Sequence, residues 1–131
     1  MQAVQNVAAR LIYKAPIYTR ASPFLRELHW LPIHQRVTFK AMCLVRRCVI
    51  GTLPGSLDKR CLLYRPSRSL RSETAGHIVT RRFRKITMGG RAFSAWDPRI
   101  WNLLRPEIRR EPNYLVFRKL LKTHLFAQIP V

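Results

Sequence analysis

Apolar residues recur every three or four positions in three stretches of the chain, which is the spacing of one face of an α-helix. The first stretch covers residues 3–13 and ends before Pro16, a residue type that interrupts helices. The second begins at Ile33 and runs to Gly51, a residue type that commonly follows the last turn of a helix. The third covers about residues 113–127. The pattern therefore predicts a mainly helical chain.

Each of these helices is amphipathic, and an apolar face of this kind normally packs against a core. The apolar positions of the first helix are Ala3, Val4, Val7, Ala8, Leu11 and Ile12. Those of the second are Val37, Ala41, Leu44, Val45 and Cys48, and its basic residues Arg36, Lys40, Arg46 and Arg47 fall mostly elsewhere. Those of the third are Leu115, Val116, Leu120, Leu121 and Leu125. Asn113 is placed to cap the third helix through its side-chain oxygen.

Weaker signals fill the intervals between these helices. Ser22-Pro23 predicts a helix start, with the serine hydroxyl as cap and the proline in the first turn. Residues 51–72 are rich in turn-forming residues and have room for one helical turn near residues 57–64. Residues 90–104 have helix-like apolar spacing that is interrupted by Pro98.

A β-branched run at residues 76–80 is the best candidate for a strand, and residues 83–87 are its candidate partner. The basic residues between the two runs make a poor tight turn. The expected architecture is therefore mainly α: a small helical domain with a short β-hairpin or an irregular basic segment near residues 76–90.

The charge balance points to a polyanionic partner. The chain contains 25 Lys and Arg against 6 Asp and Glu, which gives a formal net charge of +19, and its calculated pI is 11.6. Such an excess repels itself unless a partner neutralises it, and nucleic acid is the commonest such partner. An anionic membrane is an alternative that requires a cleaner amphipathic face. A merely soluble basic surface is the simplest alternative.

Arginines concentrate between residues 65 and 91, where guanidinium groups suit bidentate contact with phosphate. The candidate nucleic-acid-binding residues are Arg65, Arg68, Arg71, Arg81, Arg82, Arg84, Lys85 and Arg91. Tyr64, Phe83 and Phe93 are interleaved with them and have the rings needed to stack on unpaired bases. For Phe93, Trp96 and Trp101, the helical spacing favours a place in the core.

No residue set carries catalysis or a metal. The only aspartates, Asp58 and Asp97, are far apart, so they do not form the carboxylate cluster that divalent cations require. The pairs His29/His34 and Cys43/Cys48 are spaced more widely than zinc ligands usually are, which favours buried cysteines. We expect no catalytic residue, no metal, no cofactor and no small-molecule substrate.

Compartment signals favour the cell interior. The three cysteines are an odd number and no secretory signal precedes them, so we expect an intracellular protein, nuclear or cytoplasmic. No apolar run is long enough for a transmembrane segment. The amphipathic start has no acidic residue before Glu27, which leaves a mitochondrial destination as an alternative.

Five segments, in order, resemble the end of the reverse transcriptases encoded by LINE-type (non-LTR) retrotransposons. They are VQNVAARLI at 4–12, LRELHWLPIHQRVTFKAMCL at 25–44, RPSRSLRS at 65–72, GGRAFSAWDPRIWNLL at 89–104 and FRKLLKTHLF at 117–126. The resemblance covers nearly the whole chain. It implies a remnant of the last helix of a reverse transcriptase domain at residues 1–15, followed by a retrotransposon C-terminal domain at residues 16–131.

The resemblance implies a non-catalytic fragment of an RNA-directed DNA polymerase, because the polymerase's catalytic aspartates have no counterpart here. An upstream reverse transcriptase domain is then an implied partner, and the apolar face of the first helix would be exposed without it. Arg105 stands where relatives have proline, and Trp96-Asp97 replaces small residues, as in a decayed genomic copy. Alternatives are an imported mitochondrial or ribosome-associated basic RNA-binding protein, a surviving polymerase activity, or a pseudogene product with no function.

Overall fold

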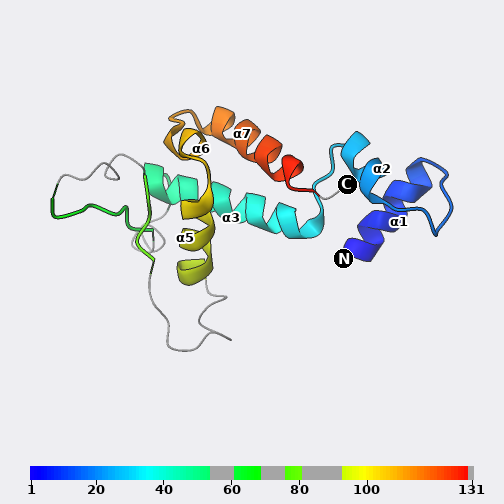
Figure 1. Cartoon of the computed structure of the whole chain (residues 1–131), viewed down its shortest axis with the longest axis horizontal. Helices are drawn as coiled ribbons and strands as arrows, with labels where there is room; N and C mark the ends of the chain where they lie inside the picture. The colour runs from blue at the N-terminus through cyan, green and yellow to red at the C-terminus, as the bar shows by residue number, and fades with distance from the viewer. Residues whose placement is uncertain (54–60, 69–75, 81–92, 130–131) are drawn as a thin grey trace. The chain divides into compact units, whose positions relative to one another are not determined.

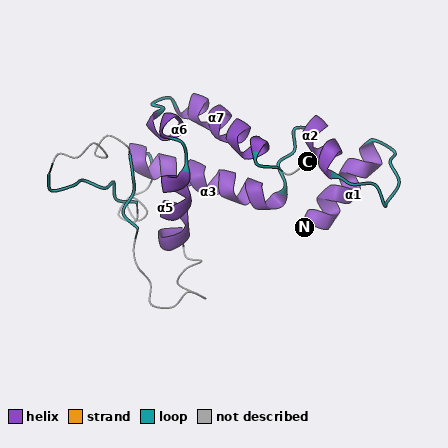
Figure 2. Cartoon of the chain, viewed as in Figure 1, coloured by secondary structure: helices purple, strands orange, loops and turns teal. Residues whose placement is uncertain are grey.

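The computed structural model describes residues 1–53, 61–68, 76–80 and 93–129, with the backbone alone for residues 93–97. Within these ranges the chain is mainly helical, as predicted (Figure 2). Its extended pairing there is limited to one isolated bridge. The helices are α1 (Gln2–Ile12), α2 (Ser22–Glu27), α3 (Ile33–Ile50), α5 (Phe93–Leu103), α6 (Pro106–Arg110) and α7 (Tyr114–Ala127) (Figure 1). None of the described helices is long and apolar enough to span a membrane.

The chain divides into two compact units. The first unit comprises Met1–Lys40 and Lys119–Val131, and the second comprises Ala41–Arg118. Helices α3 and α7 each contribute residues to both units. The domain boundary that the resemblance implies at residue 15 stays a prediction.

In the first unit, α1 turns its polar and small residues inward. Gln5 and Ala9 are its buried residues, and the Gln5 amide donates a hydrogen bond of 3.0 Å to the carbonyl of Leu31. The side-chain oxygen of Gln2 accepts a hydrogen bond of 2.8 Å from the backbone N–H of Ile33. The large apolar side chains of α1 therefore lie on the opposite side, where they are exposed.

Helix α2 begins where the Ser22-Pro23 pair predicted, but the cap is different. Ser22 is itself the first helical residue, Ala21 occupies the N-cap position, and no side chain caps the helix. The expected capping role of Ser22 is therefore wrong. The proline lies in the first turn as predicted, where its missing N–H leaves no intrahelical bond unmade.

Helix α3 ends as predicted, but its buried face differs from the predicted apolar face. Gly51 has φ +74° and donates its N–H to Cys48, while Thr52 donates to Arg47, which is the hydrogen-bond pattern of a Schellman cap. Val37 and Leu44, predicted as apolar-face residues, are exposed. The buried residues of α3 are Thr38, Met42, Cys43, Val45, Arg46 and Cys48.

In the second unit, an extended segment at residues 77–79 is held on both sides. Leu63 and Ile78 form an antiparallel bridge, flanked by hydrogen bonds from Tyr64 N–H to the His77 carbonyl at 2.8 Å and from Val79 N–H to the Leu62 carbonyl at 2.9 Å. Residues 62–64 are thus extended rather than part of the predicted helical turn, whose residues 57–60 lie outside the description. The candidate partner strand at 83–87 also lies outside the described residues.

Helix α5 fastens that segment through two consecutive residues. The Trp101 Nε1–H donates to the Gly76 carbonyl at 2.9 Å. The Asn102 amide accepts from the Ile78 N–H and donates to the Ile78 carbonyl, both at 2.9 Å. Pro98 lies inside α5 rather than interrupting it.

Helix α7 begins at its predicted cap, where the Asn113 side-chain oxygen accepts hydrogen bonds from the N–H groups of Leu115 and Val116. Its buried side chains are Phe117, Leu121 and Leu125. The predicted face was partly wrong, since Leu115, Val116 and Leu120 are exposed. Helix α6 was not predicted, because five residues are too few to show helical periodicity.

Candidate nucleic-acid interface

The paired segments around Leu63 and Ile78 present two of the side chains that phosphate and base recognition require. Tyr64 and Arg65 follow the bridge residue and are both exposed. A guanidinium in this position can bind a phosphate bidentately, and an exposed phenol ring can stack on an unpaired base. Because Trp101 and Asn102 fasten the neighbouring segment, the backbone carrying these two side chains is anchored to α5.

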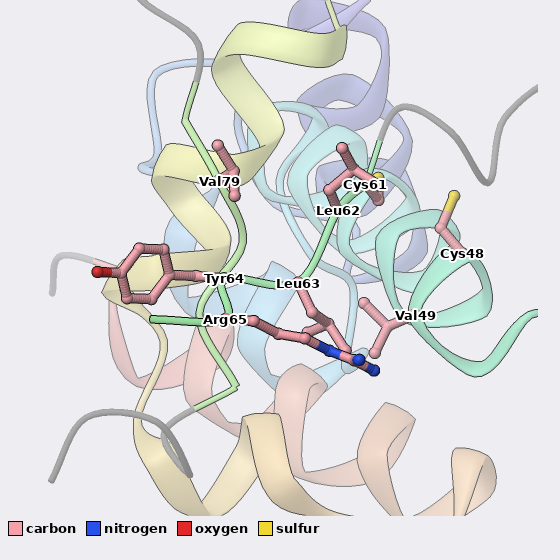
Figure 3. Close-up of a pocket in the computed structure, with 8 residues that line it drawn as sticks. All are labelled: Cys48, Val49, Cys61, Leu62, Leu63, Tyr64, Arg65 and Val79. Carbon is pink, nitrogen blue, oxygen red and sulfur yellow. The ribbon is translucent and has the colours of Figure 1, made fainter. Parts of the chain in front are cut away.

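A shallow depression of about 630 Å³ adjoins this segment (Figure 3). Its lining is mostly apolar and consists of Cys48, Val49, Cys61, Leu62, Leu63, Tyr64, Arg65 and Val79. Figure 3 shows Tyr64 and Arg65 leaving the extended segment on opposite sides, as consecutive strand residues do. A polar ligand would find one cation there, on an otherwise apolar surface.

Two of the eight predicted binding residues fall within the described part of the chain. Arg65 and Arg68 are both exposed, in keeping with a role in binding a partner from solvent. The remaining candidates lie outside the described residues: Arg71, Arg81, Arg82, Arg84, Lys85 and Arg91. Of the aromatic residues, Tyr64 is exposed and Trp101 is fully buried, as the helical spacing predicted for Trp101.

Two other arginines are buried, and neither was predicted to be. Arg46 is 8% exposed and Arg109 is 5% exposed. The Arg46 guanidinium donates hydrogen bonds to the carbonyls of Arg109 and Glu111 and lies 5.8 Å from the centre of the Phe117 ring. These carbonyls belong to the C-terminal end of α6, where backbone oxygens lack helical partners and partial negative charge collects. Arg46 is therefore a structural cap rather than a binding residue.

The second buried arginine contacts a histidine. Arg109 Nη1 lies 2.7 Å from His77 Nδ1. An arginine can only donate, so this nitrogen of His77 is the acceptor. Burial lowers the pKa of both Arg46 and Arg109, and the Nε of each has no hydrogen-bond partner among the described residues. Both arginines remain charged at neutral pH, because the ordinary pKa of an arginine side chain is far above 7.

The cysteines are buried as predicted, and the environment of Cys43 alters its acidity. Burial raises the pKa of the Cys43 thiol, although a hydrogen bond from Tyr114 and the charge of Arg118 act in the opposite direction. Burial and the neighbouring Cys43 also raise the pKa of Tyr114. Both groups are therefore neutral at physiological pH.

Ionisation of Cys43 is expected to destabilise the fold above about pH 9. Its pKa is raised from the ordinary value of 9.0, so its contribution to stability is complete below the unfolded-state pKa. That contribution is lost as the pH rises through the folded-state pKa. In urea denaturation, the stability advantage of the protein over its Cys43→Ala variant should shrink above about pH 9. The lysine residues lose their charge in both proteins alike, so their effect cancels in the comparison. A difference in the free energy of unfolding that stays constant with pH would contradict this prediction.

Within the described ranges, no group of three His, Cys, Asp or Glu side chains is arranged to hold a metal ion. His29 and His34 are both exposed, and Cys43 and Cys48 are buried on one helix. Asp58 and the side chain of Asp97 lie outside the description.

The chain matches no known protein family, no curated protein and no solved structure.

Proposed function

We propose that the chain binds RNA or DNA through phosphate contacts, as a non-catalytic C-terminal segment of a retrotransposon-type RNA-directed DNA polymerase. The observation that carries the proposal is the net charge of +19. An anionic polymer relieves the self-repulsion of such a chain and releases its own counterions on binding. We assign no catalytic step to the chain.

The arginine-rich part of the sequence is the proposed contact surface. In the sequence, Arg65 directly follows one of the two paired segments, and Arg81 comes two residues after Val79 of the other. Arg65 and Arg68 are exposed, and Tyr64, which leaves the segment on the opposite side from Arg65, offers a ring for stacking. These contacts read phosphate and base faces, which all sequences share, so binding is expected to show little sequence preference.

Affinity for a mixed-sequence single-stranded RNA should fall steeply as salt rises from about 50 to about 200 mM. The double variant Arg65→Gln/Arg68→Gln removes two proposed phosphate contacts. It should flatten the plot of log affinity against log salt by about 1.4, since each single-strand contact contributes about 0.7. Fluorescence anisotropy of labelled RNA measures this slope.

The matched control is Arg36→Gln/Lys40→Gln, which removes the same charge from two exposed positions on α3. Its slope should change much less than that of the Arg65/Arg68 variant. Equal changes in both variants would contradict the assignment of the contacts to residues 65–91. Absence of RNA binding at the lowest salt would overturn the proposal as a whole.

A further inference from the structure

The outer face of α1, formed by Val4, Val7 and Leu11, is open to solvent. These side chains are 73%, 51% and 73% exposed, and they lie one helical turn apart along the same side of the helix. A contiguous apolar surface of this kind is uncommon on a protein that has no partner for it.

The opposite side of α1 is fixed, so the helix cannot turn its apolar side chains inward. Gln5 is bonded to the Leu31 carbonyl, Gln2 accepts from the Ile33 N–H, and Ala9 is fully buried. Rotating the helix to bury Val4 and Leu11 would break both hydrogen bonds. The exposure of the outer face is thus built into the first unit.

The loop after α1 adds further exposed apolar residues and positive charge to the first unit. Ile17 and Tyr18 are 85% and 90% exposed. The Arg10 side chain donates a hydrogen bond of 2.7 Å to the Thr19 carbonyl, which ties this loop to the helix. Lys14 and Arg20 are exposed on either side of the loop apolar residues. No acidic residue precedes Glu27 in the sequence.

We propose that the outer face of α1, together with Ile17 and Tyr18, binds the surface of an anionic lipid bilayer. An amphipathic helix that lies in the membrane interface combines an exposed apolar stripe with cations, because the acyl region takes the stripe and the acidic headgroups take the charges. Tyrosine is favoured at that depth, since its ring is apolar and its hydroxyl reaches water. A nucleic acid offers no comparable apolar cover, and a second copy would bring another charge of +19 against the first.

Vesicle co-sedimentation of the full chain tests this proposal, with phosphatidylcholine–phosphatidylserine vesicles compared with pure phosphatidylcholine vesicles. The protein should bind the anionic vesicles and bind the neutral ones much less. The triple variant Val4→Gln/Val7→Gln/Leu11→Gln keeps good helix formers and all charges. It should bind anionic vesicles about thirtyfold more weakly.

The control variant Leu103→Gln/Leu115→Gln replaces two exposed leucines of α5 and α7, and its vesicle binding should stay within about twofold of the unaltered protein. Circular dichroism checks that each variant is folded. If the triple variant unfolds, the single variant Leu11→Gln should still lower binding, by about threefold.

Three results would overturn the proposal. The first is unchanged binding of the triple variant, which would leave only general attraction of a basic protein to acidic lipid. The second is no vesicle binding by the unaltered protein. The third is a dimer, seen by sedimentation equilibrium, that the triple variant converts to monomer, since a second copy would then cover the face.

Discussion

Replacing Trp101 with alanine is expected to lower the free energy of unfolding by about 3–5 kcal/mol. The indole is fully buried, and its ring centre lies 5.9 Å from the ring centre of Phe117. Its N–H donates a hydrogen bond to the Gly76 carbonyl. Removing it leaves a cavity in the second unit and an unsatisfied carbonyl in the segment that precedes Ile78. Because a domain of this size is stable by only about 5–15 kcal/mol, the variant should lose a large part of its stability.

Urea denaturation followed by far-ultraviolet circular dichroism measures this loss. Trp101→Phe keeps an aromatic ring but removes the donor, so it should cost about 1–3 kcal/mol. Leu103→Ala is the matched control on the same helix, because Leu103 is 82% exposed, and it should change stability by less than about 0.5 kcal/mol. A Trp101→Ala variant as stable as the Leu103→Ala variant would disprove the buried position of the indole.

The second large effect is expected at Arg46, where substitution by alanine should cost about 2–4 kcal/mol. Its guanidinium satisfies the carbonyls of Arg109 and Glu111 and stacks near Phe117, so alanine leaves two acceptors unmet and a void beside the ring. Arg46→Met restores volume but no donor, and it should recover less than half of the loss. The measurement is again urea denaturation at neutral pH.

The adjacent residue supplies the control. Arg47 is exposed on the next position of α3, so Arg47→Ala should change stability by less than about 0.5 kcal/mol. Both variants remove one positive charge, and relief of charge repulsion is therefore common to them. Equal stabilities of the two alanine variants would contradict the capping role of Arg46.

The contrast between these neighbours shows what the sequence was able to predict. Periodicity located α3 within a few residues, and the glycine at its end supplied the predicted cap. Periodicity gives the spacing of the residues on one helix face, but it does not decide which of two adjacent positions at the edge of that face is buried. Arg46 and Arg47 were therefore not distinguished by the sequence. The burial of Arg46 depends on carbonyls that are more than sixty residues away in the sequence, and no local pattern encodes that contact.

Helix α1 shows a different limit. The sequence correctly predicted an amphipathic helix over nearly the observed residues. Periodicity alone normally assigns the apolar face to the core, whereas the structure buries Gln5 and Ala9 and exposes Val4 and Leu11. The hydrogen bond that Gln5 donates to the Leu31 carbonyl and the one that Gln2 accepts from the Ile33 N–H decide the outcome. They join parts of the chain whose proximity a hydrophobic pattern does not reveal.

The candidate interface was predicted by residue type more than by geometry. The exposure of Arg65 and Arg68 follows from their charge, and the burial of Trp101 follows from apolar spacing. The sequence did not predict the pairing of Leu63 with Ile78. It predicted a helical turn near residues 57–64, and it gave residues 83–87 as the partner of the strand at residues 76–80. The Asn102 amide of α5 holds the other side of Ile78, and no local sequence pattern predicts that contact.

The amide of Asn102 also opposes the association of this protein with other copies through strand pairing. A short run of β-branched residues normally presents an unpaired edge on which strands from other molecules can add and begin to aggregate. At Ile78 the backbone groups directed away from Leu63 are already taken by one side chain. An incoming strand therefore finds no free backbone N–H or C=O group at Ile78 with which to form a β-ladder.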